Sequence, residues 1–196
     1  MEIMLLTKDN FQAAVEAAAK TIYRGGAVIA PTDTVYGLLA KATDKKAIEK
    51  IFAIKLRPKN KPLPMFVKNM AMAKKLAKIS PVQEKFLEEK WPGKFTVRLN
   101  RKKGVKLFGA DSETIALRIP FYPFVNSLLE TVDLPLCGTS ANISGQAASG
   151  KIGTVLAQFG GNAAFPDLVV NAGDLAKSNP STIIDLTQSV PQIIRP

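Results

Sequence analysis

The sequence predicts a layered α/β domain built on a mixed β-sheet. Amphipathic stretches with the helical period alternate along the chain with short apolar runs of strand length. Several of these runs are apolar throughout, as strands buried on both faces are, whereas residues 95–99 alternate as half-buried strands do. A chain of 196 residues suits one domain with a single core, and no repeat, low-complexity tract or linker divides it. We therefore expect residues 1–196 to form one domain.

The N-terminal part of the chain predicts two helices, each with an apolar stripe at the helical period. Asp9 or Asn10 can cap the first helix, and Gly25 is suited to end it. The second begins near Asp44 and must stop before Pro58, because proline disfavours the helical conformation in the residue before it. In chain order, the predicted elements are a helix at 11–22, a strand at 27–31, a helix that starts near 44 and a strand at 63–67.

The next helix has the best-defined start in the sequence. Ser80 can cap it, Pro81 suits its first position, and Gln83 can complete a capping box. This helix should run towards Trp91. Beyond it, the patterns predict strands at 95–99 and 114–119, a helix at 123–131, an apolar run at 134–137, a helix at 155–159, and strands at 167–170, 181–186 and 192–195.

The composition excludes several classes of mechanism. The chain has no histidine and one cysteine, so a Ser-His-Asp or Cys-His hydrolase cannot be built from it, and a structural zinc site is nearly excluded. Cys137 lies in an apolar run, which favours packing in the core over a nucleophilic role. The apolar run at residues 3–6 is too short for a secretion signal, and no run approaches the roughly 18 apolar residues of a spanning helix. We expect a cytoplasmic protein with no membrane partner.

Basic residues are concentrated in one part of the chain. The formal net charge is +11, and residues 41–106 hold 20 of the 27 lysines and arginines but only 5 of the 16 acids. Many of these lysines can simply solvate helix faces. The remainder indicate an anionic partner, for which nucleotides or RNA are the natural candidates.

Residues 30–38, APTDTVYGL, form a first candidate site. A buried strand runs into two threonines, a carboxylate and a phenol, and ligands of α/β sheets commonly lie beyond strand ends. The alternative is a tight turn based on Pro31 and Asp33.

Residues 55–63, KLRPKNKPL, form a second candidate site. Lys55, Arg57, Lys59 and Lys61 occupy alternate positions, so an extended segment would direct all four to one side. Two prolines favour an extended backbone in the residues before them. Such a row of cations suits a triphosphate, and a solvated basic loop is the alternative.

Residues 134–150, LPLCGTSANISGQAASG, form a third candidate site. Gly138 and Gly145 permit close backbone approach, so successive N–H groups could surround an anion. The Walker spacing is absent, and an ordinary polar loop is the alternative. The small polar side chains of this segment are Thr139, Ser140, Asn142 and Ser144.

Arg118 is a charged residue within the apolar strand TIALRIP. A charged residue in such a position must pair or meet a ligand. Arg118 could bind a substrate carboxylate, or it could form a salt bridge to Asp111 or Glu113.

Six motifs occur in a set order: PTDTVYGL, K-x-R-P-x-x-K-P-L, WPG with a following threonine, RIP, SANISG and STIIDL. Through them the chain resembles, over nearly its whole length, the YrdC/Sua5 family of L-threonylcarbamoyladenylate synthases in its short single-domain form. The resemblance implies a twisted mixed sheet flanked by helices around a large positively charged cavity. It also implies a nucleotidyltransferase reaction, in which L-threonine, bicarbonate and ATP give threonylcarbamoyl-AMP and pyrophosphate, for the threonylcarbamoyladenosine (t6A) modification of tRNA.

The resemblance implies roles for particular residues of this chain. Lys55 and Arg57 would be catalytic. The residues implied for ATP binding are Lys55, Arg57, Lys61, Ser140, Asn142 and Arg195. Those implied for L-threonine and its carbamate are Thr34, Tyr36, Arg118 and Ser181. Thr32, Thr139 and Ser144 are further candidate site residues with no ligand assigned. Phe66 stands where longer members of the family often carry a histidine near threonine.

The implied cofactor and partners follow from the same resemblance. Mg²⁺ would arrive with ATP, with no dedicated protein ligand identified for a metal. Contact with tRNA and a separate downstream threonylcarbamoyl transferase complex are implied. When two anions must meet, positioning and charge neutralisation supply most of the catalysis, so no histidine is needed. The alternative from a different class is an RNA-binding module of the same fold without catalysis, although the basic region lacks a regular aromatic interleaving.

Overall fold

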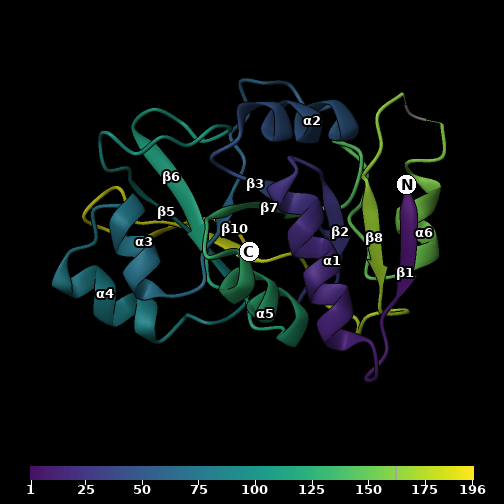
Figure 1. Cartoon of the computed structure of the whole chain (residues 1–196). Helices are drawn as coiled ribbons and strands as arrows, with labels where there is room; N and C mark the ends of the chain where they lie inside the picture. The colour runs from purple at the N-terminus through teal and green to yellow at the C-terminus, as the bar shows by residue number, and fades with distance from the viewer. Residues whose placement is uncertain (162) are drawn as a thin grey trace.

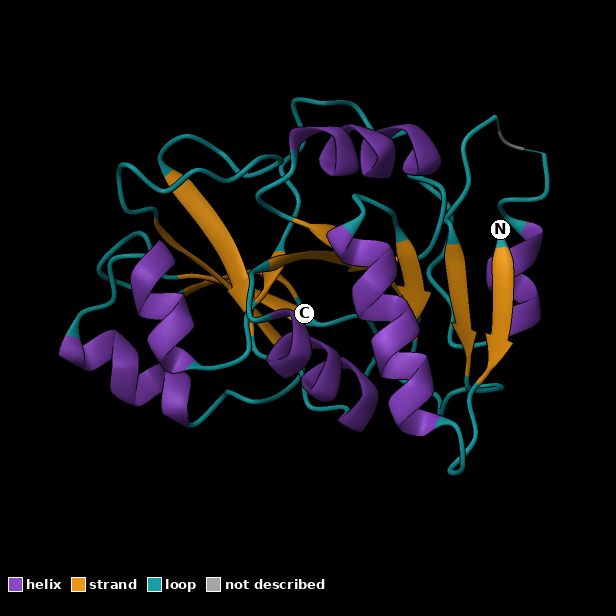
Figure 2. Ribbon diagram, in the orientation of Figure 1, coloured by secondary structure: helices purple, strands orange, loops and turns teal. Residues whose placement is uncertain are grey.

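The computed structural model describes residues 1–161 and 163–196. In these residues the strands form one ten-stranded sheet with helices packed around it (Figure 1, Figure 2). The helices are α1 (Phe11–Tyr23), α2 (Lys45–Lys55), α3 (Met70–Leu76), α4 (Pro81–Glu88), α5 (Pro123–Val132) and α6 (Ile152–Ala157). The strands are β1 (Glu2–Leu5), β2 (Val28–Ala30), β3 (Gly37–Lys41), β4 (Met65–Phe66), β5 (Phe95–Asn100), β6 (Thr114–Arg118), β7 (Leu136–Ser140), β8 (Leu168–Asn171), β9 (Thr182–Asp185) and β10 (Gln192–Arg195).

The sheet is mixed, so the predicted α/β class is confirmed. Its strand order is β1-β8-β2-β3-β7-β4-β6-β5-β9-β10. Among the paired strands, β8 is parallel to both β1 and β2, and β5 is parallel to β9, whereas β3 is antiparallel to both of its neighbours. No helix within the described residues combines the length and the apolarity that crossing a membrane requires.

The centre of the sheet brings two loops together. β3 pairs with β2 and β7, so that Gly37 lies opposite both Ala30 and Ser140. The pairing continues beyond β7, because the amide of Ala141 donates to the carbonyl of Tyr36 at 2.8 Å. The loop between β2 and β3 and the loop after β7 therefore leave the same end of the sheet as neighbours.

One face of the sheet packs against α1 and α5, which lie next to each other in Figure 1. Val28, Ala30 and Leu39 contribute to this cluster, and the rings of Phe11 and Phe124 meet edge to face at 6.1 Å between centroids. Alternate strand residues reach the other face, because side chains of a strand point to opposite sides in turn.

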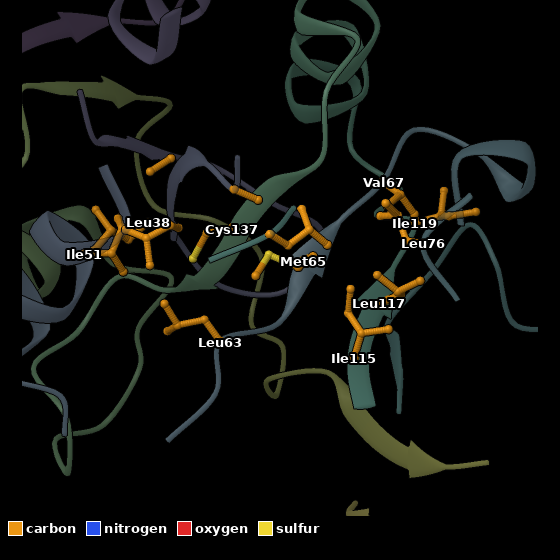
Figure 3. Packing of buried hydrophobic residues seen from close by; sticks show 14 of the residues in the cluster. Leu38, Ile51, Leu63, Met65, Val67, Leu76, Ile115, Leu117, Ile119 and Cys137 are labelled. Carbon is orange, nitrogen blue, oxygen red and sulfur yellow. The ribbon is translucent and has the colours of Figure 1, made fainter. Parts of the chain in front are cut away.

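The second apolar cluster packs against α2 and α3. Figure 3 shows Leu38 and Ile51 on one side of Cys137 and Met65 on the other. Cys137 is completely buried here, as expected for core packing, and burial raises the pKa of its thiol to about 12. A thiol with so high a pKa carries almost no thiolate near neutral pH, which removes it as a nucleophile.

The local sequence signals for the helix ends are confirmed in part. At the start of α4, the Gln83 amide donates to Ser80 Oγ at 3.3 Å and the Ser80 amide donates to Gln83 Oε1 at 2.9 Å, which completes the capping box. α4 ends at Glu88, short of Trp91. Asn10 is the N-terminal cap residue of α1, but its side chain accepts from the amide of Thr7 instead of capping the helix.

Other elements differ from the prediction. β3 lies in a segment that the sequence analysis treats as the end of a loop, while β1 and α3 are not predicted at all. α6 starts at Ile152 and ends at Ala157, earlier than the predicted 155–159. These elements are short, and strand formation at β3 and β1 depends on pairing with distant strands that no local pattern reveals.

Candidate active site

A cavity of about 470 Å³ lies at the end of the sheet from which the two central loops leave. This volume is typical of a small-molecule site. Lys55, Arg57, Lys61, Arg118 and Arg195 make its lining strongly positive, and no acidic residue is among the described residues that line it. Every residue to which a role was assigned from the sequence lines this one cavity, the others being Thr32, Thr34, Tyr36, Thr139, Ser140, Asn142, Ser144 and Ser181.

The predicted row of four cations at residues 55–61 is not formed. α2 continues through Lys55, and Leu56 then takes a left-handed conformation with φ of 49° that ends the helix. Lys55 is therefore buried, with 2% of its surface exposed, whereas Lys59 is exposed and does not line the cavity. The prediction of an extended segment is wrong because the apolar stripe of α2, which includes Ile51 and Ile54, keeps the chain helical up to Lys55.

Lys55 makes three hydrogen bonds within the protein. Its Nζ donates to the carbonyls of Ser140 and Asn142 at 2.6 and 2.8 Å, and to Asn142 Oδ1 at 3.1 Å. Burial lowers the pKa of this ammonium group to about 8, and the nearby charge of Arg57 lowers it as well. The group thus sits inside the cavity wall and is not an exposed loop charge.

The side chain of Arg57 is held by backbone carbonyls of the loop that follows α2. Its Nε donates to the carbonyl of Lys61 at 3.0 Å and its Nη2 to the carbonyl of Pro62 at 2.8 Å. These bonds do not use Nη1, which can donate to an anion in the cavity. Partial burial lowers the pKa of the guanidinium, but from so high a value that it stays charged.

The loop after β7 is closed by the side chain of Asn142. Its Nδ2 donates to the carbonyls of Ile143 and Gln146 at 2.9 and 2.7 Å, and its Oδ1 accepts from Ser140 Oγ at 2.5 Å. Asn142 therefore shapes this loop from within. Ser140 lies beside it on the cavity wall, and Gly145 has a φ of +91° that a side chain would oppose.

Arg118 pairs with Asp33, which corrects the two partners considered from the sequence, Asp111 and Glu113. Arg118 Nη2 lies 2.6 Å from Asp33 Oδ1, and both side chains are more than nine-tenths buried. Its Nε donates to the carbonyl of Gly93 at 2.9 Å, and its Nη1 donates to Thr34 Oγ1 at 3.3 Å. Asp33 Oδ2 is buried and has no hydrogen-bond partner among the described residues.

Asp111 has another role. Its Oδ1 accepts from the amides of Glu113 and Thr114 in the turn before β6. These amides lower the pKa of the Asp111 carboxyl, which is nearly fully exposed. Arg118 is thus fixed from the loop that precedes β3, not from its own hairpin, and it keeps guanidinium N–H groups for a carboxylate in the cavity.

Two further wall segments carry hydroxyl groups. Thr32 Oγ1 donates to the carbonyl of Val35 at 2.6 Å and lies 3.1 Å from Thr34 Oγ1, which orders the loop between β2 and β3. Thr139 lines the cavity from β7. Ser144 Oγ is buried and has no partner among the described residues, so it is a hydroxyl available to a ligand.

Arg195 enters the cavity from β10. Its Nε and Nη2 donate to the carbonyl of Ser181 at 3.2 and 2.6 Å, while Ser181 Oγ lies 2.8 Å from Thr96 Oγ1. Thr96 was not predicted as a site residue, although it is the threonine that follows WPG. Phe66 was noted only as a departure, and it proves to be a cavity wall whose ring centre lies 5.6 Å from the guanidinium carbon of Arg118.

Tyr36 lines the cavity, but its hydroxyl is engaged elsewhere. It donates to the carbonyl of Gly173 at 2.6 Å and accepts from the amide of Ala172 at 3.0 Å. Burial raises the pKa of the phenol. The hydroxyl therefore anchors the segment after β8, and the ring forms the wall.

This geometry makes a prediction for Tyr36→Phe. Loss of the hydroxyl should lower the free energy of unfolding by about 1 kcal/mol, because a partly buried carbonyl and an amide lose their partner. Urea denaturation measures this, with Tyr23→Phe as the control, since Tyr23 is 51% exposed and water can replace its hydroxyl. Unchanged stability in Tyr36→Phe would contradict the anchoring role.

The described residues contain no group of three or more Cys, Asp or Glu side chains arranged to hold a metal ion. Basic and hydroxyl groups dominate the cavity lining, and the buried carboxylate of Asp33 is paired with Arg118. Such a donor set suits a polyanion.

The profile of the Sua5_yciO_yrdC family, described as Telomere recombination, matches residues 20–196. A threonylcarbamoyl-AMP synthase from Pyrococcus abyssi is 33% identical over 184 residues, which are 93% of this chain and 53% of that protein. A relative from Methanocaldococcus jannaschii is 32% identical over 186 residues, which are 95% of this chain and 86% of that protein. The chain spans about half the length of the Pyrococcus relative.

A solved structure extends the likeness to three dimensions. The crystal structure of Pyrococcus abyssi Sua5 complexed with L-threonine matches with a TM-score of 0.86 and 31% identity, over 100% of this chain and 56% of that one. The fold that carries the cavity is therefore shared with that protein.

Proposed function

The chain belongs to the Sua5/YciO/YrdC family, and from this and the cavity we propose that it is an L-threonylcarbamoyl-AMP synthase. The reaction joins L-threonine, bicarbonate and ATP and releases pyrophosphate. The observation that carries the proposal is the convergence of five cationic side chains with threonine and serine hydroxyls on one cavity of about 470 Å³. A relative with 33% identity bears the name of this activity, and a structural relative was crystallised with L-threonine.

In the proposed reaction two anions must meet. Bicarbonate and a proton give carbon dioxide and water, and the amine of threonine then adds to the carbon dioxide to form a carbamate and gives up a proton. A carbamate oxygen then attacks the α-phosphorus of ATP, the bond from that phosphorus to the bridging oxygen breaks, and pyrophosphate leaves. Fixed positive charge lowers the barrier by offsetting the repulsion between the reactants and the charge that develops on the leaving group.

The cavity offers a place for each reactant. Arg57, Lys61 and Arg195 would hold the triphosphate, with Ser140, the last residue of β7, and Ser144 of the following loop beside it. Arg118, fixed by Asp33 and Thr34, would hold the carboxylate of threonine through its remaining N–H groups. Ser181 and Thr96, hydrogen-bonded to each other at 2.8 Å, line the cavity close to Arg195. This arrangement would bring the carbamate to the α-phosphate with little loss of freedom at the moment of reaction.

Mg²⁺ would enter with ATP as its counter-ion. Among the described residues, none that lines the cavity has a carboxylate to hold a resident divalent ion, so phosphate oxygens and water would supply its ligands. The ion would neutralise charge on the phosphates and stabilise the leaving pyrophosphate.

Pyrophosphate release tests the proposal. With ATP, L-threonine and bicarbonate present, the protein should release pyrophosphate and form an adenylate with the mass of threonylcarbamoyl-AMP. Omitting threonine or bicarbonate should each reduce release to background, and Arg57→Met should lower it sharply while Lys59→Met leaves it unchanged. Release that continues without either substrate would overturn the proposed reaction.

A second function, contact with RNA, is favoured by a separate hollow. Lys78 and Lys102 line it together with Ser80, Asn100 and the ion pair between Lys74 and Glu84. We propose that this surface contacts tRNA in the cytoplasm, close to the transferase complex that would use the adenylate. Replacing Lys78 and Lys102 by glutamate should weaken tRNA binding and its salt dependence without changing pyrophosphate release. If the parent protein binds tRNA but makes no adenylate, the alternative of a binding module without catalysis is favoured.

A further inference from the structure

Lys55 differs from the other cations of the cavity in having no donor left. An ammonium group has three N–H bonds, and those of Lys55 go to the carbonyls of Ser140 and Asn142 and to Asn142 Oδ1. Arg57, by contrast, uses only Nε and Nη2 in its hydrogen bonds to backbone carbonyls and keeps Nη1 for a ligand. An anion in the cavity could take an N–H from Lys55 only by breaking one of these contacts.

The backbone of Lys55 is attached to the same loop. Its carbonyl accepts from the amide of Ser144 at 2.8 Å. The residue at the end of α2 is thus bonded to Ser140, Asn142 and Ser144, which span the turn after β7. α2 is packed into the core through Ile51 and Ile54. Lys55 therefore attaches the polar loop after β7 to a rigid helix, and polar loops are otherwise among the more mobile segments of a protein.

We propose that Lys55 is a positioning residue, which acts on the nucleotide through the turn 140–144 and does not itself contact a phosphate. The proposal rests on the proposed function for its ligand. In this proposal Lys55 and Arg57, which belong to the same KLRPKNKPL segment, have different roles. Lys55 holds two carbonyl oxygens and one side-chain oxygen of this turn. It thereby fixes the position of the Ser144 hydroxyl, which has no partner among the described residues and is available to an incoming anion.

The charge of Lys55 makes this arrangement sensitive to pH. Burial, and after it the charge of Arg57, lower its pKa to about 8, and Cys137 on β7 is the other ionisable group that acts on it, in the raising direction. Neutral lysine can donate only two hydrogen bonds, so the turn should loosen as the pH rises through this pKa. Since the unfolded chain keeps the ordinary lysine pKa near 10.4, it binds more protons between about pH 8 and 10.4, and the contribution of Lys55 to stability rises over that window. Nucleotide affinity and stability should therefore change in opposite directions.

Three single variants separate a positioning role from a phosphate contact. Lys55→Met and Arg57→Met each remove a cavity cation, and Lys59→Met removes an exposed cation of the same segment. Hydrogen–deuterium exchange of amides 140–146 is measured without ligand, and affinity for α,β-methylene-ATP is measured by calorimetry. Lys55→Met should speed exchange and lower affinity about tenfold, the scale of one hydrogen bond to a charged group. Arg57→Met should lower affinity with unchanged exchange, and Lys59→Met should match the parent in both.

A pH series on the unaltered protein completes the test. Affinity for α,β-methylene-ATP should fall between pH 7.5 and about 9.5 in the parent protein, around the lysine pKa, and stay flat in Lys55→Met. Unchanged exchange in Lys55→Met together with weaker binding would mean that Lys55 contacts phosphate directly, and would overturn the proposal. An affinity in the parent that is independent of pH would also overturn it, even if Lys55→Met fails to fold. Hydrogen–deuterium exchange is measured without ligand and does not depend on synthase activity. A protein without synthase activity would therefore count against the proposed function, while the effect of Lys55 on the turn 140–144 could still be tested.

Discussion

Replacing Arg118 with methionine is expected to lower the free energy of unfolding by about 3–5 kcal/mol and to abolish pyrophosphate release. Removal of one partner from a buried ion pair leaves the other charge without compensation, and this loss is of that size. Asp33 has a side chain that is 8% exposed, and one of its oxygens already lacks a partner among the described residues. Thr34 and the carbonyl of Gly93 would each lose a donor too. Urea denaturation and the pyrophosphate assay measure the two effects.

Arg98 provides a matched control on the neighbouring strand. It pairs with Asp185 at 3.0 Å, and its side chain is 44% exposed whereas that of Asp185 is 9% exposed. Unlike Asp33, Asp185 keeps a second partner, because its Oδ1 accepts from the amide of Thr187 at 2.9 Å. Arg98→Met should therefore cost less than Arg118→Met. The double variant Asp33→Asn with Arg118→Met should regain part of the lost stability, because the unpaired charge is gone, yet stay inactive. An equal cost in Arg118→Met and Arg98→Met would contradict the buried pair.

Gly138→Ala is expected to lower the free energy of unfolding by about 1–3 kcal/mol, as overpacking of a core does, and to weaken threonine binding. A Cβ atom at this position would lie 2.5 Å from ring atoms of Phe66. The ring is 4% exposed and lies between β7 and Arg118, so it has little room to yield. A shifted ring would disturb Arg118. Thermal unfolding and the Michaelis constant for L-threonine measure these effects.

Gly153→Ala is the control for this prediction. Gly153 lies in α6 with no atom within 4 Å of the position a Cβ would take, so alanine there should be neutral or stabilising. Adding Phe66→Leu to Gly138→Ala should restore part of the stability, because the smaller side chain makes room. If Gly138→Ala unfolds at the parent's temperature, the close packing of ring and backbone is not what fixes this position.

The parts of the fold that follow from neighbouring residues could be predicted from the sequence. The Ser80 and Gln83 capping box is such a case, because its partners are three positions apart and their chemistry is enough. β3 could not be predicted in the same way. Its residues, Gly37 to Lys41, become a strand because β2 and β7 flank them, and a short apolar run does not reveal its partners.

The candidate site divides along the same line. Motifs placed its residues around one cavity, but their partners depend on pairings between distant segments. Asp33 and Arg118 are 85 positions apart, so the sequence favoured the nearer acids Asp111 and Glu113. Lys55 was misplaced for a different reason, since alternate spacing of cations fits a strand, while the apolar stripe of α2 extends the helix through it. The buried apolar side chains of α2 set the backbone conformation at this point, and the charged side chains adopt the positions that this conformation gives them.

The pairing of Gly37 with Ser140 has a consequence for how this cavity can change. The segments that would face the two reactants are rooted on adjacent strands, whose backbones in any sheet stand about 4.8 Å apart. This distance is set by the sheet and does not depend on the side chains that the loops carry. Substitutions in the loops can therefore change which molecules enter the cavity, while the distance between the two strands, across which the new bond would form, stays constant.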